Sequence, residues 1–213
     1  MQLTINRSIL LQACKTASGA ITGRSSLPSL SHLHFEVQDD RVSVYGTDLQ
    51  FGIRCGFDAP LADVGQFNVQ SKTFMEILNN LPQTSDVTVV WDLDHVELKS
   101  GKSKFKLHTL RYEDYWSRLT EDALTSFTMP ASTLHAAFAK TMFAVSTDET
   151  RTVVCGVNVV YHDGHIKFYS TDTHRLSRQS VQHGELAVPF NIIIPGEHLS
   201  PIVNNLSASS KHD

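Results

Sequence analysis

The segment Ser-Thr-Asp-Thr-His-Arg-Leu at residues 170–176 carries the side chains best suited to chemistry. Asp172 and His174 stand two residues apart on a segment predicted to be extended. A carboxylate and an imidazole at this spacing could ligate a metal ion, or could act as a catalytic pair beside a nucleophile. No third ligand and no nucleophile stands near them in the sequence. The segment by itself therefore argues against an enzyme active site.

Other motifs that carry chemistry are missing from the sequence. It has no Walker-type glycine loop, no paired-cysteine motif and no Gly-x-Ser-x-Gly elbow. Cys14, Cys55 and Cys155 are odd in number and widely spaced, which argues against disulfides and zinc and predicts three separate buried thiols. The 11 histidines are scattered. We therefore predict a protein that is not an enzyme and needs no metal and no cofactor.

The segment also belongs to an internal repeat. A shift of 124 residues places Tyr-Gly-Thr-Asp at 45–48 on Tyr-Ser-Thr-Asp at 169–172. After a slip of one residue, Asn-Asn-Leu at 79–81 matches Asn-Asn-Leu at 204–206. A repeat of this kind indicates one structural unit that is used twice.

A framework of helices and strands must position the first copy. Apolar residues recur at helical spacing over residues 7–19, with Asn6 as the cap, and over residues 71–81, with Ser71 as the cap. The predicted inward residues of the first helix are Ile9, Leu10, Ala13 and Ala17, and the predicted outward ones are Arg7, Gln12, Lys15 and Thr16. Strands are predicted at residues 2–5, 33–37, 41–45, 51–55, 67–69, 87–91, 95–98 and 104–110, with a hairpin turn at Asp39 and Asp40.

The second copy follows the same order. We place one domain at residues 1–120 and another at 121–213, with residues 112–121 as the linker. Residues 126–129 align with the first strand, and a helix after Pro130 should carry Leu134, Phe138, Met142 and Val145 inward. The remaining predicted elements are two strands around the His-Asp-Gly turn at 162–164, a strand at 192–194 and a helix at 197–206.

The last three strands of the first copy have no counterpart before residue 213. We therefore expect the second domain to be incomplete at its C-terminal end. A sheet that lacks its last strands has an unpaired edge, which favours assembly or aggregation unless another element covers it.

Composition and charge narrow the class of protein. The chain is 41% hydrophobic, and it shows neither a secretory signal nor a run of about 20 apolar residues, so we expect a cytoplasmic protein without membrane contact. Its formal net charge is −4. A protein that grips DNA by charge alone is normally basic, so nucleic acid is either not the partner or is held in another way.

Five segments together resemble the β sliding clamp family of bacterial DNA polymerase III. They are Leu-Thr-Ile at 3–5, Gly-Arg-Ser-Ser-Leu-Pro at 23–28, Gly-Thr-Asp-Leu at 46–49, Lys-Ser-Gly-Lys-Ser-Lys-Phe at 99–105 and Thr-Asp-Thr-His-Arg-Leu at 171–176. The resemblance implies an α+β DNA-clamp fold, in which repeated units of two helices pack on antiparallel β-sheets. Family members carry three units and dimerise into a ring around duplex DNA; this chain resembles the first unit and about two-thirds of the second.

The resemblance also implies how DNA is held. A closed ring retains double-stranded DNA by topology and needs only weak, sequence-independent phosphate contacts, so an acidic net charge is no objection. The family places a DNA-contacting arginine in the loop that holds Arg24. Lys15, Lys72 and Lys140 are helix residues that could face the central hole, or could simply be solvated. Acidic residues at 148–149, opposite Arg24 in the repeat, put a second loop contact in doubt.

The family's pocket for partner peptides matches Val154, Thr171, His174, Arg175 and Leu176. The replicative polymerase, the clamp loader and other clamp-binding proteins dock short, partly hydrophobic tails there, and an apolar concavity with a few polar groups suits such tails. The alternative is structural: Leu176 and Val154 would belong to the core, and Thr171 with Asp172 would only form a turn.

These implications lead to two hypotheses. The first is a processivity factor, a homo-oligomeric collar that tethers the replicative polymerase to DNA without doing chemistry. The second is a shortened clamp-like interaction module that binds a partner and does not close a ring by itself. A truncation of a full clamp is a third possibility.

Overall fold

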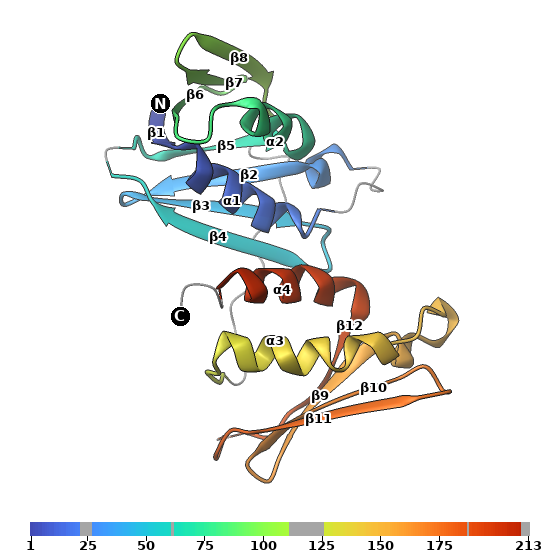
Figure 1. Cartoon of the computed structure of the whole chain (residues 1–213). Helices are drawn as coiled ribbons and strands as arrows, with labels where there is room; N and C mark the ends of the chain where they lie inside the picture. Colours follow the sequence, from blue (N-terminus) through green and yellow to red (C-terminus); the bar gives the residue numbers. More distant parts are fainter. Residues whose placement is uncertain (22–26, 61, 111–125, 187, 210–213) are drawn as a thin grey trace. The chain divides into compact units, whose positions relative to one another are not determined.

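The structure is a computed structural model that describes residues 1–21, 27–60, 62–110, 126–186 and 188–209. The chain divides into two compact units, Met1–Thr120 and Glu121–Asp213, which we call unit 1 and unit 2. Figure 1 labels the helices and strands of both. The predicted linker at residues 112–121 lies outside the described residues.

Unit 1 has the order of helices and strands that the sequence pattern predicts. The bounds are β1 (Gln2–Asn6), α1 (Arg7–Ser18), η1 (Pro28–Ser31), β2 (His32–Gln38), β3 (Arg41–Thr47), β4 (Gly52–Asp58), β5 (Gly65–Gln70), α2 (Ser71–Asn80), β6 (Asp86–Trp91), β7 (His95–Ser100) and β8 (Ser103–His108). The strands form two antiparallel sheets, ordered β1-β6-β7-β8 and β4-β3-β2-β5.

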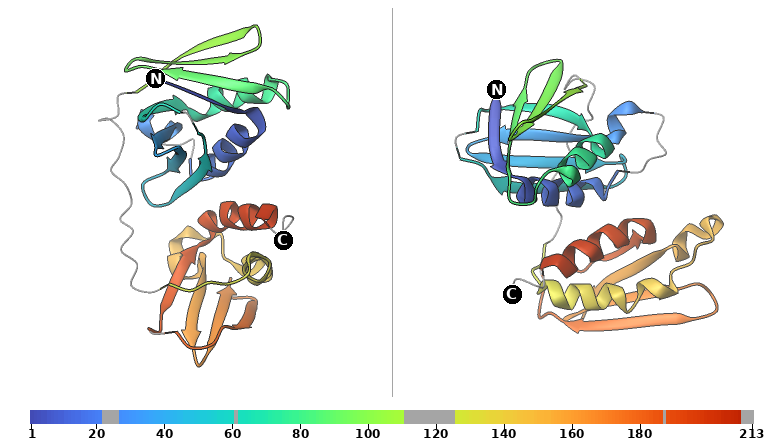
Figure 2. Two further views of the ribbon diagram at one scale, coloured as in Figure 1. Left: turned by 90° about the vertical axis from the view of Figure 1, so that its left-hand side faces the viewer. Right: turned by 45° about the horizontal axis from the view of Figure 1, so that its top comes forward.

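The core of unit 1 joins both sheets to both helices. Phe35 of β2 stacks on Phe67 of β5 with ring centroids 4.6 Å apart, and Phe74 of α2 packs against Phe35 at 5.6 Å. Leu10 of α1 and Leu98 of β7 are fully buried in the same cluster. Figure 2 shows the helix pair beside the sheets from two further directions.

Helix α1 begins and ends as predicted, but its faces differ from the prediction at two positions. The Asn6 side chain caps the helix by accepting a hydrogen bond from the Ser8 N–H at 2.9 Å. Ile9, predicted inward, is 46% exposed. Arg7, predicted outward, is buried, since it donates from Nε to the Leu78 carbonyl at 2.6 Å and from a guanidinium nitrogen to the Asn79 carbonyl at 3.0 Å.

The cap predicted for α2 also differs. Gln70 occupies the N-cap position without a side-chain cap bond, and Ser71 is the first, buried helical residue. At the other end, the last carbonyls of α2 are the ones that Arg7 satisfies. Free carbonyls at a helix C-terminus need hydrogen-bond donors, and this need explains why Arg7 of the neighbouring helix is buried rather than exposed.

Unit 2 consists of α3 (Ala131–Ala139), η3 (Met142–Ala144), η4 (Glu149–Val154), β9 (Gly156–His162), β10 (His165–Thr171), β11 (Leu176–Gln182), β12 (Asn191–Pro195) and α4 (Gly196–Ser209). Its antiparallel sheet is ordered β11-β10-β9-β12. Figures 1 and 2 show α3 and α4 side by side across one face of this sheet. Phe138, Phe168 and Leu199 form the buried centre.

The two units repeat each other in detail. The sheet β4-β3-β2-β5 of unit 1 corresponds to β11-β10-β9-β12 of unit 2. Tyr45 pairs with Arg54 across one sheet, and Tyr169 pairs with Arg178 at the matching place in the other. In each pair the guanidinium carbon lies over the tyrosine ring, at 5.3 Å and 5.9 Å from the centroid. The predicted α+β architecture of two helices on antiparallel sheets is confirmed.

Both predicted hairpin turns have left-handed backbone at their two central residues. The φ angles are 50° and 60° at Asp39 and Asp40, and 51° and 71° at Asp163 and Gly164. Two consecutive residues with positive φ are the signature of the turn whose twist matches that of paired strands.

Three features of unit 2 differ from the prediction. Helix α3 ends at Ala139 and does not continue to Val145, because the Thr141 hydroxyl donates back to the carbonyls of Ala137 and Phe138. Strand β11 was not predicted. Residues 126–130, which align with β1, form no strand, and the described part of unit 2 contains no counterpart of β6, the strand that pairs with β1 in unit 1.

Within the described residues, no helix combines the length and the apolar character needed to cross a membrane.

Candidate functional site

The Thr-Asp segment forms a tight turn between β10 and β11. The Asp172 carboxylate Oδ1 accepts hydrogen bonds from the N–H groups of His174 at 3.0 Å and Arg175 at 2.9 Å. Thr171 Oγ1 donates to the Arg175 carbonyl at 2.7 Å and accepts from the Thr173 N–H at 3.0 Å. Thr173 has a φ of 77°, which is costly for a β-branched residue. The side chains of Thr171 and Asp172 therefore hold a strained turn in one shape.

Unit 1 contains the same turn, bond for bond. Asp48 Oδ1 accepts from the N–H groups of Gln50 at 3.0 Å and Phe51 at 2.7 Å. Thr47 Oγ1 donates to the Phe51 carbonyl at 2.7 Å and accepts from the Leu49 N–H at 3.0 Å. Leu49 has a φ of 79°. The side chains of the Thr-Asp pair therefore hold the same turn in both units.

The two turns differ in the side chains after the aspartate. Where unit 1 has a glutamine, a phenylalanine and a glycine, unit 2 has His174, Arg175 and Leu176. Arg175 Nε lies 2.8 Å from Asp172 Oδ2, and its guanidinium carbon lies 5.5 Å from the centroid of the Phe143 ring. Leu176 is 69% exposed and so is not a core residue. Unit 2 therefore presents an arginine in a fixed orientation beside an exposed leucine.

Exposed apolar side chains near this turn were missed by the sequence analysis. Phe143 of η3 is 58% exposed and contacts Arg175, and Val153, next to the predicted wall residue Val154 in the sequence, is 72% exposed. The predicted wall residue Val154 is half-buried at the end of η4, where its carbonyl accepts a hydrogen bond from the Ser146 N–H at 3.0 Å. No periodic signal marks Phe143, because it lies in the short turn that follows the early end of α3.

Asp172 is held in its ionised form. The N–H of Arg175 contributes most to lowering the pKa of this carboxyl below its ordinary value, and the N–H of His174 and the Arg175 side chain add to the effect. No group of three or more His, Cys, Asp and Glu side chains in the described part of the chain is arranged to hold a metal ion. The hydrogen bonds of the turn orient the side chains that follow Asp172.

The predicted DNA-contacting lysines of unit 1 lie on its helix pair. Arg7 joins the start of α1 to the end of α2, so the two helices run antiparallel. Lys15 near the end of α1 and Lys72 in the first turn of α2 therefore lie at the same end of the pair, and both are exposed. Glu76 is also exposed on α2, which makes the surface only mildly basic. Arg24 lies outside the described residues.

In unit 2, Lys140 is exposed at the C-terminal end of α3, and its carbonyl accepts a hydrogen bond from Ser177 Oγ at 2.6 Å. The acidic loop is arranged around Asp148, which accepts from the Thr150 hydroxyl at 2.6 Å and lies 3.3 Å from Arg151 Nε. The Thr150 hydroxyl contributes most to lowering the pKa of Asp148. Arg151, 60% exposed, is a basic residue in this loop that the sequence analysis missed.

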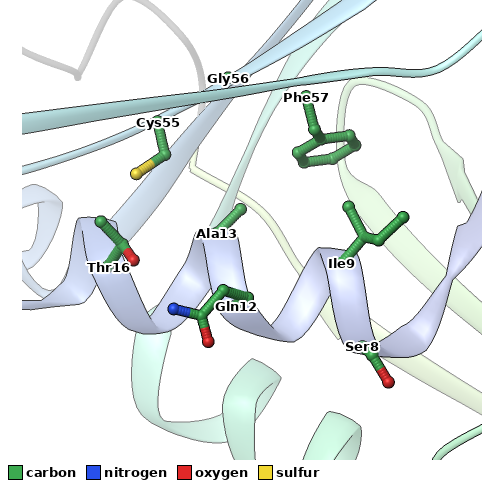
Figure 3. A pocket seen from close by; sticks show the side chains of 8 residues that line it. All are labelled: Ser8, Ile9, Gln12, Ala13, Thr16, Cys55, Gly56 and Phe57. Atoms are coloured by element: carbon green, nitrogen blue, oxygen red, sulfur yellow. The ribbon is translucent and has the colours of Figure 1, made fainter. Parts of the chain in front are cut away.

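A groove between α1 and β4 in unit 1 was not predicted. It has a volume of about 440 Å³. Figure 3 shows Cys55 pointing toward Thr16 and Phe57 toward the exposed Ile9. Burial raises the pKa of the Cys55 thiol and also that of Cys14, so neither is poised as a nucleophile. All three thiols are free, but only Cys14 is fully buried, which corrects the prediction for Cys55 and Cys155.

Each of the two successive units has a helix pair on an antiparallel sheet and its own copy of the Thr-Asp turn. This arrangement defines an α+β protein built by duplication of a clamp unit. Residues 1–118 match the family model described as DNA polymerase III beta subunit, N-terminal domain, and residues 128–211 match that of its central domain. The chain belongs to the DNA polymerase III beta subunit family.

Curated relatives carry the name Beta sliding clamp. The protein from Proteus mirabilis is 26% identical over 212 residues, which cover 99% of this chain and 58% of the relative. The protein from Halalkalibacterium halodurans is 30% identical, and the match covers 95% of this chain and 56% of the relative. The chain thus spans a little over half the length of these relatives.

Solved structures match the fold over nearly the whole chain. The DNA polymerase sliding clamp from Caulobacter crescentus is 27% identical with a TM-score of 0.88, and the match covers 98% of this chain and 58% of that one. A sliding clamp from Bartonella birtlesii, solved bound to griselimycin, is 25% identical with a TM-score of 0.91 and is covered to 57%. The resemblance inferred from the five sequence segments is confirmed.

Proposed function

We propose that this chain forms part of a sliding clamp. Such a clamp encircles duplex DNA in the cytoplasm and tethers the replicative polymerase to it without catalysing a reaction. The observation that carries the proposal is the tandem repeat of one helix-and-sheet unit, whose two copies match the N-terminal and central domains of the family in order. Because a passive ring performs no chemistry, the proposal includes no metal and no cofactor. A homo-oligomer would close the ring.

The DNA-facing surface in this proposal is the helix pair of each unit. Lys15, Lys72 and Lys140 would contact phosphates, together with Arg24. Exposed lysines on long flexible side chains form contacts that exchange easily, which suits sliding better than a rigid bidentate grip. The net charge of −4 fits a ring that retains DNA by enclosing it.

The partner-facing surface in this proposal is the turn of unit 2. Val154, Thr171, His174, Arg175 and Leu176 would receive short peptides from the polymerase, the clamp loader and other clamp-binding proteins. Arg175, held by Asp172 and Phe143, would bind the polar part of such a peptide. The exposed Leu176, and the exposed Phe143, would contact its apolar anchor.

A second hypothesis applies to the 213 residues by themselves. The described part of unit 2 contains one four-stranded sheet, whereas the described part of unit 1 contains two. A polypeptide of this content could act as a clamp-like module that binds partner peptides weakly and does not enclose DNA.

Retention on circular DNA separates the two hypotheses. The purified protein is loaded onto nicked circular plasmid by a bacterial clamp loader, freed of unbound protein by gel filtration, and treated with an enzyme that cuts the plasmid once. A ring co-elutes with the circle and leaves the linear product by sliding off its ends. The module is retained by neither form, and light scattering finds it monomeric. Retention that cutting does not reduce would refute enclosure of DNA.

A further inference from the structure

A pocket of about 690 Å³ opens at one end of unit 1, where β1, the end of β2, the start of β5 and the β6–β7 turn meet. Its volume lies in the range of sites that bind small ligands or short peptides. None of the residues proposed above to contact DNA or a partner peptide lines it. The proposed function therefore leaves this pocket unused.

The floor of the pocket contains an unpartnered donor. Trp91 is 3% exposed, and its indole ring packs against Phe67 with centroids 4.9 Å apart. Its Nε1–H is buried and makes no hydrogen bond in the described part of the chain. Indole nitrogen is a donor only, and a buried tryptophan normally finds an acceptor. The exception points to a ligand that supplies an acceptor oxygen.

Gly65 and Met1 lie over this donor. A Cβ atom at Gly65 would stand 3.0 Å from Trp91 Nε1 and 2.5 Å from Met1 Sδ, so a side chain at this position would press against the indole nitrogen and the methionine. Met1 Sδ lies beside this position, and Met1 is 62% exposed. Methionine is unbranched and flexible, so its side chain can move aside when a ligand enters.

The mouth of the pocket is apolar and is flanked by acidic groups. Val64 and Leu93 are 67% and 87% exposed, which is unusual for two large apolar side chains beside one opening. Asp92 lines the same pocket, as does Glu36, whose Oε2 accepts a hydrogen bond from the Tyr45 hydroxyl at 3.0 Å. Asp92 Oδ1 accepts hydrogen bonds from the N–H groups of Asp94 at 2.8 Å and His95 at 2.7 Å, and it lies 3.9 Å from His95 Nδ1.

We propose that this pocket is a second docking site, which binds a short peptide segment in which a bulky aliphatic side chain stands next to a basic residue. The aliphatic side chain fills the space between Val64 and Leu93. The carbonyl of the segment accepts the hydrogen bond from Trp91 Nε1, and the basic side chain lies toward Glu36 and Asp92. Anionic ligands are disfavoured, because both charged residues that line the pocket are acidic.

The indole N–H signal of Trp91 in ¹H–¹⁵N NMR spectra tests the proposal. The chain has two tryptophans, and the Trp91→Phe variant identifies the signal. The probe is the capped peptide acetyl-Ala-Leu-Lys-Ala-amide. We expect a saturable downfield shift with this peptide, since a hydrogen-bonded indole N–H is deshielded. No shift at concentrations up to about 10 mM would overturn the proposal.

Two control peptides test the chemistry of the ligand. Replacing the leucine of the probe by glycine should abolish the shift. Replacing its lysine by glutamate should weaken binding about two- to fivefold, the effect of an exposed ion pair. Equal binding of all three peptides would refute the assignment. So would equally tight binding of acetyl-leucine-amide, which would indicate a site for small molecules.

Two variants test the location. Gly65→Val, which fills the space over the indole, should weaken binding at least about tenfold. If this variant does not fold, Leu93→Ser carries the test: Leu93 is 87% exposed, so its replacement spares the core and should weaken binding about two- to fivefold. Unchanged affinity in a folded Gly65→Val variant, or in Leu93→Ser, would overturn the proposal.

Discussion

Asp172 acts on the backbone of its own turn, as Asp48 does in the other unit. Both carboxylates accept two N–H groups, and these bonds compensate the positive φ of Thr173 and Leu49. A residue held in that region costs on the order of 1–3 kcal/mol, so the turn depends on the bonds that enforce it. Unit 2 adds an ion pair from Asp172 to Arg175, which fixes an exposed side chain.

Acidification should release this turn. The N–H of Arg175, together with the N–H of His174 and the Arg175 side chain, holds the pKa of Asp172 below 3.8, its ordinary value. The ionised carboxylate therefore stabilises the turn above that pH. The stabilisation is lost as the pH falls through the folded-state pKa. We expect the amide signals of His174 and Arg175 to move together in ¹H–¹⁵N NMR spectra, with a midpoint below 3.8.

The matched control is Asp172→Asn, whose side-chain oxygen can still accept both N–H groups but does not titrate. The two amide signals should then stay constant over the same pH range, while circular dichroism confirms that the protein stays folded. A wild-type midpoint at or above 3.8 would show that the turn does not stabilise the carboxylate.

At the scale of elements, the contact between the second strand of the sheet and the end of the first helix differs between the two units. A Cβ at Gly46 of β3 would lie 2.2 Å from the carbonyl oxygen of Ala17 in α1. The repeat places Ser170 of β10 opposite Thr141 in unit 2, and there Ser170 Oγ donates to the Thr141 carbonyl at 2.5 Å. Helix α3 ends two residues before Thr141, which leaves room for a side chain where α1 leaves none.

Exchanging these residues should damage each unit by a different mechanism. Gly46→Ser forces a side chain against a backbone carbonyl and should lower the free energy of unfolding of unit 1 by about 3 kcal/mol. Ser170→Gly removes a buried hydrogen bond and loosens a strand, and should cost unit 2 about 1–2 kcal/mol. Urea unfolding followed by amide NMR signals from each unit measures both values. A Gly46→Ser loss below about 0.5 kcal/mol would refute the close contact.

The sequence predicts the helices, strands and turns that have a local signal, such as apolar periodicity, a capping residue or a turn residue. Helix α1 and the strands of unit 1 have apolar periodicity and a local cap, and both hairpin turns have residues that tolerate positive φ. Strand β11 escaped prediction because its sequence, Leu-Ser-Arg-Gln-Ser-Val-Gln, is mostly polar and its alternation is between exposed and half-exposed positions. A strand held mainly by backbone pairing to β10 leaves little hydrophobic signal.

Contacts between elements are what local patterns cannot predict. Arg7 looks like a surface residue until the end of α2 is placed beside it. The same limit applies to the candidate site. The turn and its Thr-Asp pair follow from the repeat, but Phe143 becomes visible only once the early end of α3 and the cation–π contact with Arg175 are known.

At the scale of the molecule, each unit has its own core, and the basic side chains proposed to contact DNA are few. Among the described residues, buried apolar side chains form one cluster in unit 1 and another in unit 2, and none belongs to both. The net charge is −4. If DNA is retained by enclosure, direct binding to linear duplex should therefore be weak and should depend on a small number of phosphate contacts.

The salt dependence of binding to a linear duplex tests this expectation. Four cations per chain are proposed to contact phosphates, so the slope of log K against log salt, expressed per chain bound, should be no steeper than about −4. Lys15→Ala and Lys72→Ala should each reduce the magnitude of this slope by about 1 and weaken binding equally for all DNA sequences. Fluorescence anisotropy with a labelled duplex, at several salt concentrations, measures the slope.

The control is Lys102→Ala, in the turn between β7 and β8, because this exposed lysine is outside the helix pair and should leave the slope unchanged. Equal effects of all three substitutions would mean that the chain attracts DNA through its general surface charge. A wild-type slope much steeper than about −4 would mean a direct grip on many phosphates. Such a grip would oppose sliding and would contradict retention of DNA by enclosure with few phosphate contacts.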